Sequence, residues 1–194
     1  TLDENTTITW TYGGQDSSIP TPQNELVINP FAEHPNYEAS WSGFGSGNGS
    51  TTTQSTPINS AALRWSVTEG TQNTPGFVSD QVIVHDTVYY VSGSTLKAVD
   101  AATGNLIASA QIGSKVSYFA RPLYVNGMIV VATDDGCLTA FSATTMECIW
   151  KTEPLDTTNA LQSVSSLTVN NGTILAEFTK MSGFDAAGGY MVAV

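Results

Sequence analysis

The chain has 194 residues, of which 41% are hydrophobic and 12% are charged, and its formal net charge is −11. That hydrophobic fraction is enough for a packed core, so a fully disordered chain is excluded. Six Lys and Arg residues against 17 Asp and Glu residues exclude a protein that binds nucleic acid by neutralising its phosphates. The low charge and the many small polar residues are typical of a secreted or cell-envelope protein.

No part of the sequence resembles a membrane-spanning helix or an export signal. Apolar runs stay well short of the roughly 18–20 residues that a spanning helix needs, so we expect a chain that does not span a membrane. The sequence begins at Thr1 with neither a basic nor an apolar leader region, so we expect any export signal to be already removed.

The first forty residues, 1–40, are predicted to form an irregular N-terminal segment. Residues 30–37 contain two prolines and are typical of a loop. Residues 43–54 are rich in Gly, Ser and Thr, which indicates either a flexible linker or a long surface loop. Regular structure is therefore expected mainly beyond this region.

From residue 77 onward, short runs of β-branched and aromatic residues alternate with polar turns. Helical periodicity is almost absent from the sequence. Asn126-Gly127 and Asn171-Gly172 each separate two such runs, and Asn-Gly favours a tight hairpin turn because this turn needs positive φ. The sequence therefore predicts an all-β protein of antiparallel hairpins. The clearest runs are Val82–Val84, Val88–Val91, Met128–Val131 and Thr173–Ala176.

The hairpins recur with a regular spacing. Leu96–Asp100 reappears 42 residues later as Leu138–Ser142, and Met191–Val194 is a third copy, delayed by an insertion around residues 180–189. A period of about 40–45 residues with four short strands per repeat is typical of a β-propeller blade. The predicted fold is therefore a β-propeller of four-stranded antiparallel blades.

The number of predicted blades is too small for an ordinary closed ring, which needs about four to eight. We expect three to four visible blades in a propeller that is incomplete or atypically closed. Self-association, or blades missing from this sequence, would then complete the ring. Within residues 41–194 the predicted units are a lead-in segment at 41–76, blades at 77–113 and 117–153, and a truncated blade at 162–194.

A short motif ends the third strand of the first blade and leads into the fourth. Ala98, Asp100, Thr103 and Gly104 have the spacing Ala-x-Asp-x-x-Thr-Gly. This pattern resembles the blade-closing motif Ala-x-Asp-x-x-Thr-Gly-x-x-x-Trp of the quinoprotein (PQQ-binding-like) β-propellers. Ala108 stands where the Trp of that motif belongs.

The second blade carries the same motif with other replacements. Ala140, Thr145 and Trp150 match it, whereas Ser142 replaces the Asp and Met146 replaces the Gly. In the family that the motif resembles, the Trp packs between adjacent blades, where a large ring buries much area. The resemblance therefore implies weaker packing at the seam beside Ala108 in the first blade.

Two segments before the first blade also resemble parts of this family. Trp41–Gly45 followed by Leu63–Trp65 is similar to the usual approach to the first blade. Asp3–Trp10 imitates the blade-closing segment but is one residue short. It is therefore a candidate fourth strand, placed in the same molecule, in a partner copy or in a longer parent protein. The alternative is a frayed tail.

The two cysteines, Cys137 and Cys148, lie on consecutive predicted strands joined by a turn near residues 143–144. Antiparallel pairing is expected to bring them nearly opposite each other, where a disulfide is feasible in an oxidising compartment. The alternative is a pair of reduced thiols packed between blades.

No residue pattern indicates a catalytic or metal site. His34 lies in a proline-flanked loop and His85 at a predicted strand end, and no partners complete a two-His metal site. Asp134-Asp135-Gly136 lacks the alternating ligands and closing Glu of a calcium loop, so it is interpreted as a turn between strands.

The resemblance implies two different functions. Quinoprotein alcohol dehydrogenases hold PQQ on the propeller axis near calcium, whereas outer-membrane assembly factors use the propeller as a protein docking surface. The sequence has no vicinal cysteines and no position that we can match to the calcium ligands, so no catalytic or cofactor-binding residue is assigned. Fold alone does not confer the chemistry.

The prediction is an exported, acidic, non-catalytic module that binds a protein or a carbohydrate and needs no cofactor. The alternative is a fragment of a PQQ-dependent quinoprotein alcohol dehydrogenase-like oxidoreductase, which would use PQQ and calcium. A third hypothesis is a structural or adhesive repeat without a separable site.

Overall fold

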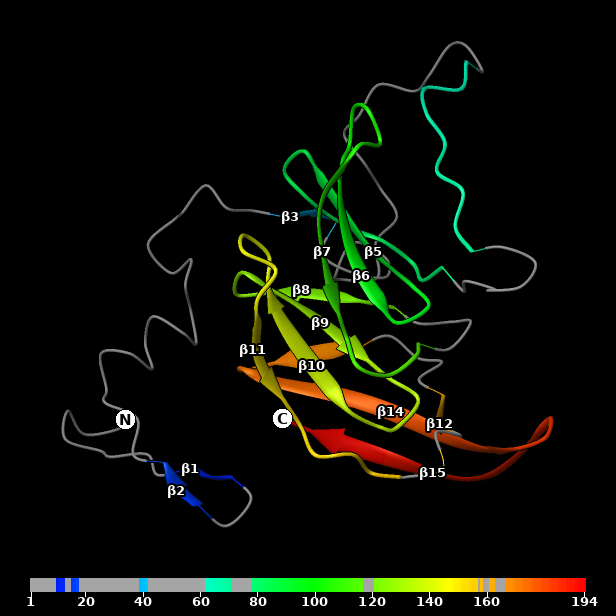
Figure 1. Cartoon of the computed structure of the whole chain (residues 1–194). Helices are drawn as coiled ribbons and strands as arrows, with labels where there is room; N and C mark the ends of the chain where they lie inside the picture. The colour runs from blue at the N-terminus through cyan, green and yellow to red at the C-terminus, as the bar shows by residue number, and fades with distance from the viewer. Residues whose placement is uncertain are drawn as a thin grey trace.

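The computed structural model of the chain describes residues 10–12, 15–17, 39–41, 62–70, 78–116, 121–156, 158, 161–162 and 167–194 (Figure 1). These residues contain strands and turns but no helix, which confirms the predicted all-β class. The strands in chain order are β1 (Trp10–Tyr12), β2 (Gln15–Ser17), β3 (Ala39–Trp41), β4 (Val82–Val84), β5 (Thr87–Ser92), β6 (Thr95–Asp100), β7 (Leu106–Gln111), β8 (Leu123–Val125), β9 (Met128–Ala132), β10 (Leu138–Ser142), β11 (Cys148–Lys151), β12 (Leu161–Gln162), β13 (Thr168–Asn170), β14 (Thr173–Ser182) and β15 (Asp185–Ala193).

The first sheet has the order β3-β4-β5-β6-β7, and every neighbouring pair is antiparallel. Its two faces differ because side chains alternate along each strand. Tyr89 and Val91 of β5 are buried on the face toward the second sheet, whereas Val88 and Tyr90 lie on the opposite face. Strands β4–β7 form the predicted four-stranded meander, and β3 adds a fifth strand beside β4.

The second sheet has the order β8-β9-β10-β11 and is also fully antiparallel. Asn126 and Gly127 connect β8 to β9 with φ values of 46° and 73°. Positive φ at both positions is what a tight primed hairpin turn requires, so the hairpin expected from Asn-Gly is confirmed. All side chains of β9 and β10 are buried, because both faces of this sheet are covered.

The third sheet is built around the long strand β14. Strands β12 and β13 pair with one edge of β14, and β15 pairs with the other. The expected insertion around residues 180–189 is the extension of the β14–β15 hairpin, which is ten and nine residues long on its two sides. Within the described part of the chain, the outer edge of β15 has no partner strand.

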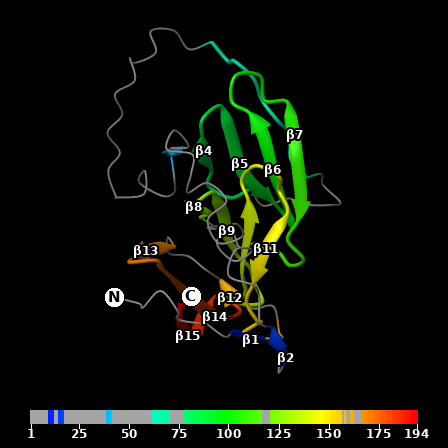
Figure 2. The ribbon, with the colours of Figure 1, turned by 90° about the vertical axis from the view of Figure 1, so that its left-hand side faces the viewer.

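Two hydrophobic cores join the three sheets, which follow one another along the molecule (Figures 1 and 2). Phe141 and Ile129 of the second sheet pack in one cluster with Val82 and Leu96 of the first. Leu138 and Val130 pack in the other cluster with Phe178 of the third sheet. The second sheet is therefore the centre of the fold.

The N-terminal strand predicted from residues 3–10 lies partly outside the described residues, which begin at Trp10. Trp10 opens β1 and pairs with Ser17 of β2 in a separate two-stranded sheet. The loops expected at 30–37 and 43–54 also lie outside the described residues. None of the described residues belongs to a helix long and apolar enough to cross a membrane.

Candidate functional site: an apolar groove on the first sheet

The motif residues of the first sheet build the turn between β6 and β7. The Oδ1 atom of Asp100 accepts hydrogen bonds from the Thr103 backbone N–H at 2.7 Å, the Thr103 hydroxyl at 2.7 Å and the Ala102 N–H at 3.0 Å. The Thr103 hydroxyl and N–H are the main reason why the pKa of Asp100 lies below its usual value. Gly104 has φ +73°, which favours glycine.

The second sheet repeats this turn with other residues. The Oγ atom of Ser142 accepts hydrogen bonds from the N–H groups of Thr144 at 3.2 Å and Thr145 at 3.1 Å, as Asp100 does in the first turn. Met146 adopts φ 61° at the position of Gly104. The turn is therefore preserved although two of its key residues differ.

The two motif alanines lie in the third strands of their sheets and are buried. Ala98 is opposite Ala108 on the neighbouring strand, and Ala140 is opposite Trp150. Both sheets have a register shift directly after this pair, so the fourth strand contains one extra residue there. A small side chain at Ala140 leaves room for the ring of Trp150, which packs against the core between the second and third sheets.

Residues 62–70 cross the outer face of the first sheet without pairing as a strand, and Trp65 anchors them there. The Trp65 ring packs on the β6–β7 turn so closely that a Cβ atom at Gly104 would lie 2.7 Å from two ring carbons. The indole Nε1 donates a hydrogen bond to the Ala101 carbonyl oxygen at 3.0 Å. Glycine at position 104 is therefore favoured both by the close approach of the Trp65 ring and by the positive φ.

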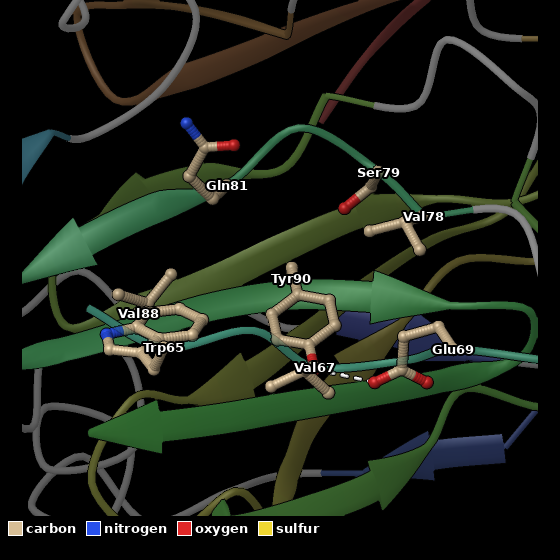
Figure 3. Close-up of a pocket in the computed structure, with 8 residues that line it drawn as sticks. All are labelled: Trp65, Val67, Glu69, Val78, Ser79, Gln81, Val88 and Tyr90. Atoms are coloured by element: carbon tan, nitrogen blue, oxygen red, sulfur yellow. Dashed lines mark hydrogen bonds between the residues drawn. The ribbon is translucent and has the colours of Figure 1, made fainter. Parts of the chain in front are cut away.

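Glu69 anchors the other end of this segment. Its carboxylate accepts a hydrogen bond from the Tyr90 hydroxyl at 2.7 Å (Figure 3). It also accepts hydrogen bonds from Lys97 Nζ at 2.7 and 2.8 Å. Burial favours the neutral carboxyl group, but the hydrogen bonds from Lys97, Tyr90 and Ser92 and the charge of Lys97 outweigh it, so the pKa of Glu69 is lowered. Burial and the carboxylate of Glu69 raise the pKa of Tyr90.

Between this segment and the sheet lies a groove of about 380 Å³. Figure 3 shows Val88 and Tyr90 of β5 beside Trp65 and Val67. Val67 and Val78 remain 43% and 48% exposed, so the groove offers apolar surface to a partner. The lining residues are Trp65, Val67, Glu69, Val78, Ser79, Gln81, Val88 and Tyr90.

The predicted proximity of the two cysteines is wrong. Cys148 pairs with Phe141, whereas Cys137 lies one residue before β10, at the other end of that strand. Both thiols are free: Cys137 is buried and Cys148 is exposed. Burial, followed by the nearby charge of Asp135, raises the pKa of Cys137 to about 11, so this thiol stays protonated at neutral pH.

The aspartates of the predicted turn at 134–136 are held by hydrogen bonds. Asp135 Oδ1 accepts from the Thr133 hydroxyl at 2.6 Å and from the Cys137 N–H at 3.2 Å, and Asp134 accepts from the Ser114 hydroxyl. The described residues contain no group of three His, Cys, Asp or Glu side chains that could hold a metal ion.

Of the two histidines, His85 lies within the described residues and His34 does not. His85 lies in the turn between β4 and β5 with φ 52°. The motif residues of the two turns stay in separate turns and form no common site.

The groove was not predicted from the sequence, although one signal was available. Trp65 precedes Ala108 by 43 residues and Trp150 by 85, so it lies one residue away from the position of the motif Trp one 42-residue period earlier. Tyr90, Glu69 and Lys97 carry no such signal, because their contact depends on how the segment folds back over the sheet.

Comparison with known proteins gives one family. The family described as outer membrane protein assembly factor BamB matches residues 49–193, three quarters of the chain. Among curated proteins, none matches the sequence.

Several solved structures are similar to part of the chain. A europium-containing methanol dehydrogenase is 20% identical over 61% of this chain, with a TM-score of 0.50. BamB from Moraxella catarrhalis is 15% identical over 60% of the chain, with a TM-score of 0.42, and a quinohemoprotein alcohol dehydrogenase from Comamonas testosteroni is 16% identical over 60%, with 0.41. The chain spans 23%, 34% and 21% of the lengths of these three proteins, respectively.

Proposed function

The chain belongs to the PQQ-like β-propeller family of the outer membrane protein assembly factor BamB, and from this premise we propose that it is a non-catalytic module that binds a protein partner. The groove on the first sheet is the binding site. The observation that supports the proposal is the lining of the groove. It contains two exposed valines, Val67 and Val78, and the rings of Trp65 and Tyr90. Its charged residue, Glu69, is already paired with Lys97. Such a surface favours burial of apolar side chains.

Glu69 and Tyr90, the ionisable groups of the groove, are suited to holding residues 62–70 on the sheet rather than to transferring protons. Glu69 has a lowered pKa and Tyr90 a raised one, so near neutral pH the first stays charged and the second stays protonated. A general acid or base works best with a pKa near the working pH. Binding is therefore the better-supported role.

A polypeptide fits the groove better than a sugar does. The Ser79 hydroxyl accepts a hydrogen bond from the Val91 N–H and donates one to the Asp80 carbonyl oxygen, and the carboxylate of Glu69 is bonded to Tyr90 and Lys97. A carbohydrate would need several polar groups that are still available for its hydroxyls, whereas apolar peptide side chains need only the valines and rings. We place this module outside the cytoplasm, secreted or in the cell envelope, because of its composition.

The residues of the groove do not fit PQQ and calcium, the cofactors of the alternative function. Glu69 is its only carboxylate and is bonded to Lys97 and Tyr90, and the lining includes no second acidic residue that would complete a calcium site. We therefore derive no quinone chemistry from this groove.

A selection from displayed random peptides, run against the wild type and two matched valine variants, tests the proposal. Val67→Asp puts a charge into the groove, whereas Val169→Asp puts one on β13, at a valine of similar exposure (37% against 43%). We expect apolar peptides to be enriched on the wild type and on Val169→Asp and lost on Val67→Asp. Equal binding to all three proteins would contradict the groove as the binding site.

A second experiment addresses the enzymatic alternative. The protein is titrated with PQQ and calcium, and bound quinone absorbance and dye-linked alcohol oxidation are measured. We expect neither signal. A bound chromophore together with alcohol oxidation would overturn the non-catalytic assignment.

A further inference from the structure

We propose that the groove binds an extended segment of its protein partner, with two apolar side chains at positions i and i+2, and that Gln81 holds the main chain of that segment. The inference rests on the proposed function in one respect, namely that the groove is the binding site. It adds the conformation of the bound segment, the spacing of its apolar residues and the residue that fixes its position.

The lining of the groove forms three rows (Figure 3). Val88 and Tyr90 of β5 are the middle row, segment 62–70 lies on one side of it, and residues 78–81 lie on the other. Every second residue of segment 62–70 from Trp65 onward lines the groove, which is typical of an extended chain because its side chains alternate between two faces. The groove therefore runs along β5 between two chain segments.

The middle row sets the spacing of the ligand. Val88 and Tyr90 are two residues apart on β5, so their side chains lie about 6.5–7 Å apart along the strand. An extended peptide has the same repeat, because its side chains on one face also recur at every second residue. Two apolar side chains at i and i+2 therefore pack over Val88 and Tyr90 together.

Gln81 differs from the other polar side chains of the lining. Gln81 is exposed and, within the part of the chain that the structure describes, its side chain forms no hydrogen bond. The other polar side chains are all hydrogen-bonded within the molecule; they belong to Trp65, Glu69, Ser79 and Tyr90. The two N–H donors and the carbonyl acceptor of the Gln81 amide are therefore available to a ligand.

A free amide beside an apolar groove is suited to the main chain of an extended segment. The N–H and C=O groups of such a segment lie along its two edges and point toward the sides of the groove. Gln81 can accept a hydrogen bond from the N–H and donate one to the C=O, so these groups stay paired when the segment leaves water. A helix pairs the same groups internally and gives Gln81 no such role.

Charge favours a segment that has basic flanks. The charged groups at the groove are paired, Glu69 with Lys97 and Asp80 with Arg121, but the side chain of Asp80 remains 54% exposed beside Gln81. The whole chain has a net charge of −11. Lys or Arg next to the two apolar residues is therefore attracted to the groove, whereas Asp or Glu is repelled.

The sequences of peptides selected on the wild type test the spacing and the charge. We expect two apolar residues at i and i+2, with Lys or Arg beside them, to be enriched over the starting library. The affinity of such a peptide should fall about threefold or more when the salt concentration is raised from about 0.05 M to about 0.3 M. Enrichment of helical i and i+4 pairs instead would contradict the extended conformation. If no apolar peptide is enriched, the proposed function itself is contradicted.

Gln81→Met tests the role of the amide, because it keeps the length of the side chain and removes its hydrogen bonds. Binding of a synthetic selected peptide, measured by isothermal titration calorimetry, should weaken about tenfold or more, because main-chain groups of the peptide lose their partner. Gln111→Met is the matched control, since Gln111 is also exposed on the first sheet but lies outside the groove. It should bind the peptide as the wild type does.

Replacing one amide of the peptide by an ester provides the second test, because the ester removes an N–H and adds no bulk. At the position bonded to Gln81, the ester should weaken binding to the wild type about fivefold or more and leave binding to Gln81→Met unchanged. Equal losses in both proteins at every position, or a Gln81→Met variant that binds like the wild type, would contradict this inference. In either case, peptides that bind the wild type but not Val67→Asp would still support the groove as the binding site.

Discussion

The turns that close the third strands of the first and second sheets have the same backbone but are covered in different ways. In the first, the large ring of Trp65 packs on Gly104, and its indole donates to the Ala101 carbonyl oxygen. In the second, the hydroxyl of Tyr89 donates to the Ala143 carbonyl oxygen at 2.5 Å. Ala101 and Ala143 are equivalent residues, 42 positions apart.

The difference shows how the interface between the first and second sheets is filled although the motif Trp is replaced by Ala108. Where the ring is lost at Ala108, the facing turn carries Met146 in place of glycine, and both residues belong to the core between the first and second sheets. Met146 is only 6% exposed, so this seam is filled despite the missing Trp. A side chain from the second sheet therefore lies in the core beside Ala108, and the weaker packing that the family resemblance implies at this seam stays a prediction.

The largest effect is expected from removing the side chain that fills this seam. Met146→Ala should lower the free energy of unfolding by about 2–4 kcal/mol, because it leaves a cavity in the core. Urea unfolding followed by far-UV circular dichroism measures this. Phe184→Ala, at a phenylalanine that is fully exposed, is the control and should change stability little. Equal losses in both variants would contradict the role of Met146.

The next effect concerns the hydrogen bond that replaces the indole. Tyr89→Phe leaves the buried Ala143 carbonyl oxygen without this donor and should cost about 1–3 kcal/mol of unfolding free energy. Tyr190→Phe, at a tyrosine that is 38% exposed, should cost about 0.5 kcal/mol or less. The same unfolding experiment compares the two variants. An unchanged free energy of unfolding in Tyr89→Phe would contradict the equivalence of the two turns.

A comparable effect, confined to one turn, is expected in the first sheet. Gly104→Ala should displace Trp65 and cost about 1–3 kcal/mol, through both a positive φ and a close contact. Gly93→Ala shares the positive φ but meets nothing within 4 Å, so it isolates the contribution of the backbone. Tryptophan emission should shift to longer wavelength in Gly104→Ala only. An unchanged spectrum would contradict the contact between Trp65 and the turn.

The smallest effect distinguishes the two turns by pH. The folded pKa of Asp100 is lowered, so its stabilising contribution is present above the unfolded pKa of about 3.9 and is lost as the pH falls through the folded pKa. The second turn has Ser142 there and no such dependence. Asp100→Ser should therefore be slightly less stable than the wild type at pH 6 and equal to it near pH 2. A difference that grows on acidification would contradict this assignment.

The sequence was sufficient to predict the strands and hairpin turns, because turn residues and hydrophobic spacing act over a few neighbouring residues. The Asn126-Gly127 turn and the repeated third strands follow from local residue patterns and their spacing, whereas the motif turns are what the family resemblance implied. The cysteine pairing failed because the turn spans residues 142–147 and pairs Phe141 with Cys148, which places Cys137 at the far end of its strand.

Contacts across the seams could be predicted only in part. The family resemblance indicated that a Trp packs between blades, but nothing in the sequence indicated that Tyr89 or Met146 would replace it. The groove was missed for the same reason, since Glu69 meets Tyr90 and Lys97 only when residues 62–70 fold over the sheet. These contacts join residues that are 21 and 28 positions apart and follow no repeat.

The central claim is that residues 62–70 and the groove beneath them are a docking site for a protein partner. Hydrogen–deuterium exchange of the backbone amides of residues 62–70, measured with and without a peptide selected on the wild type, tests it most directly. The account predicts slower exchange of these amides when the peptide is bound. Exchange that is unchanged by a bound peptide would contradict it.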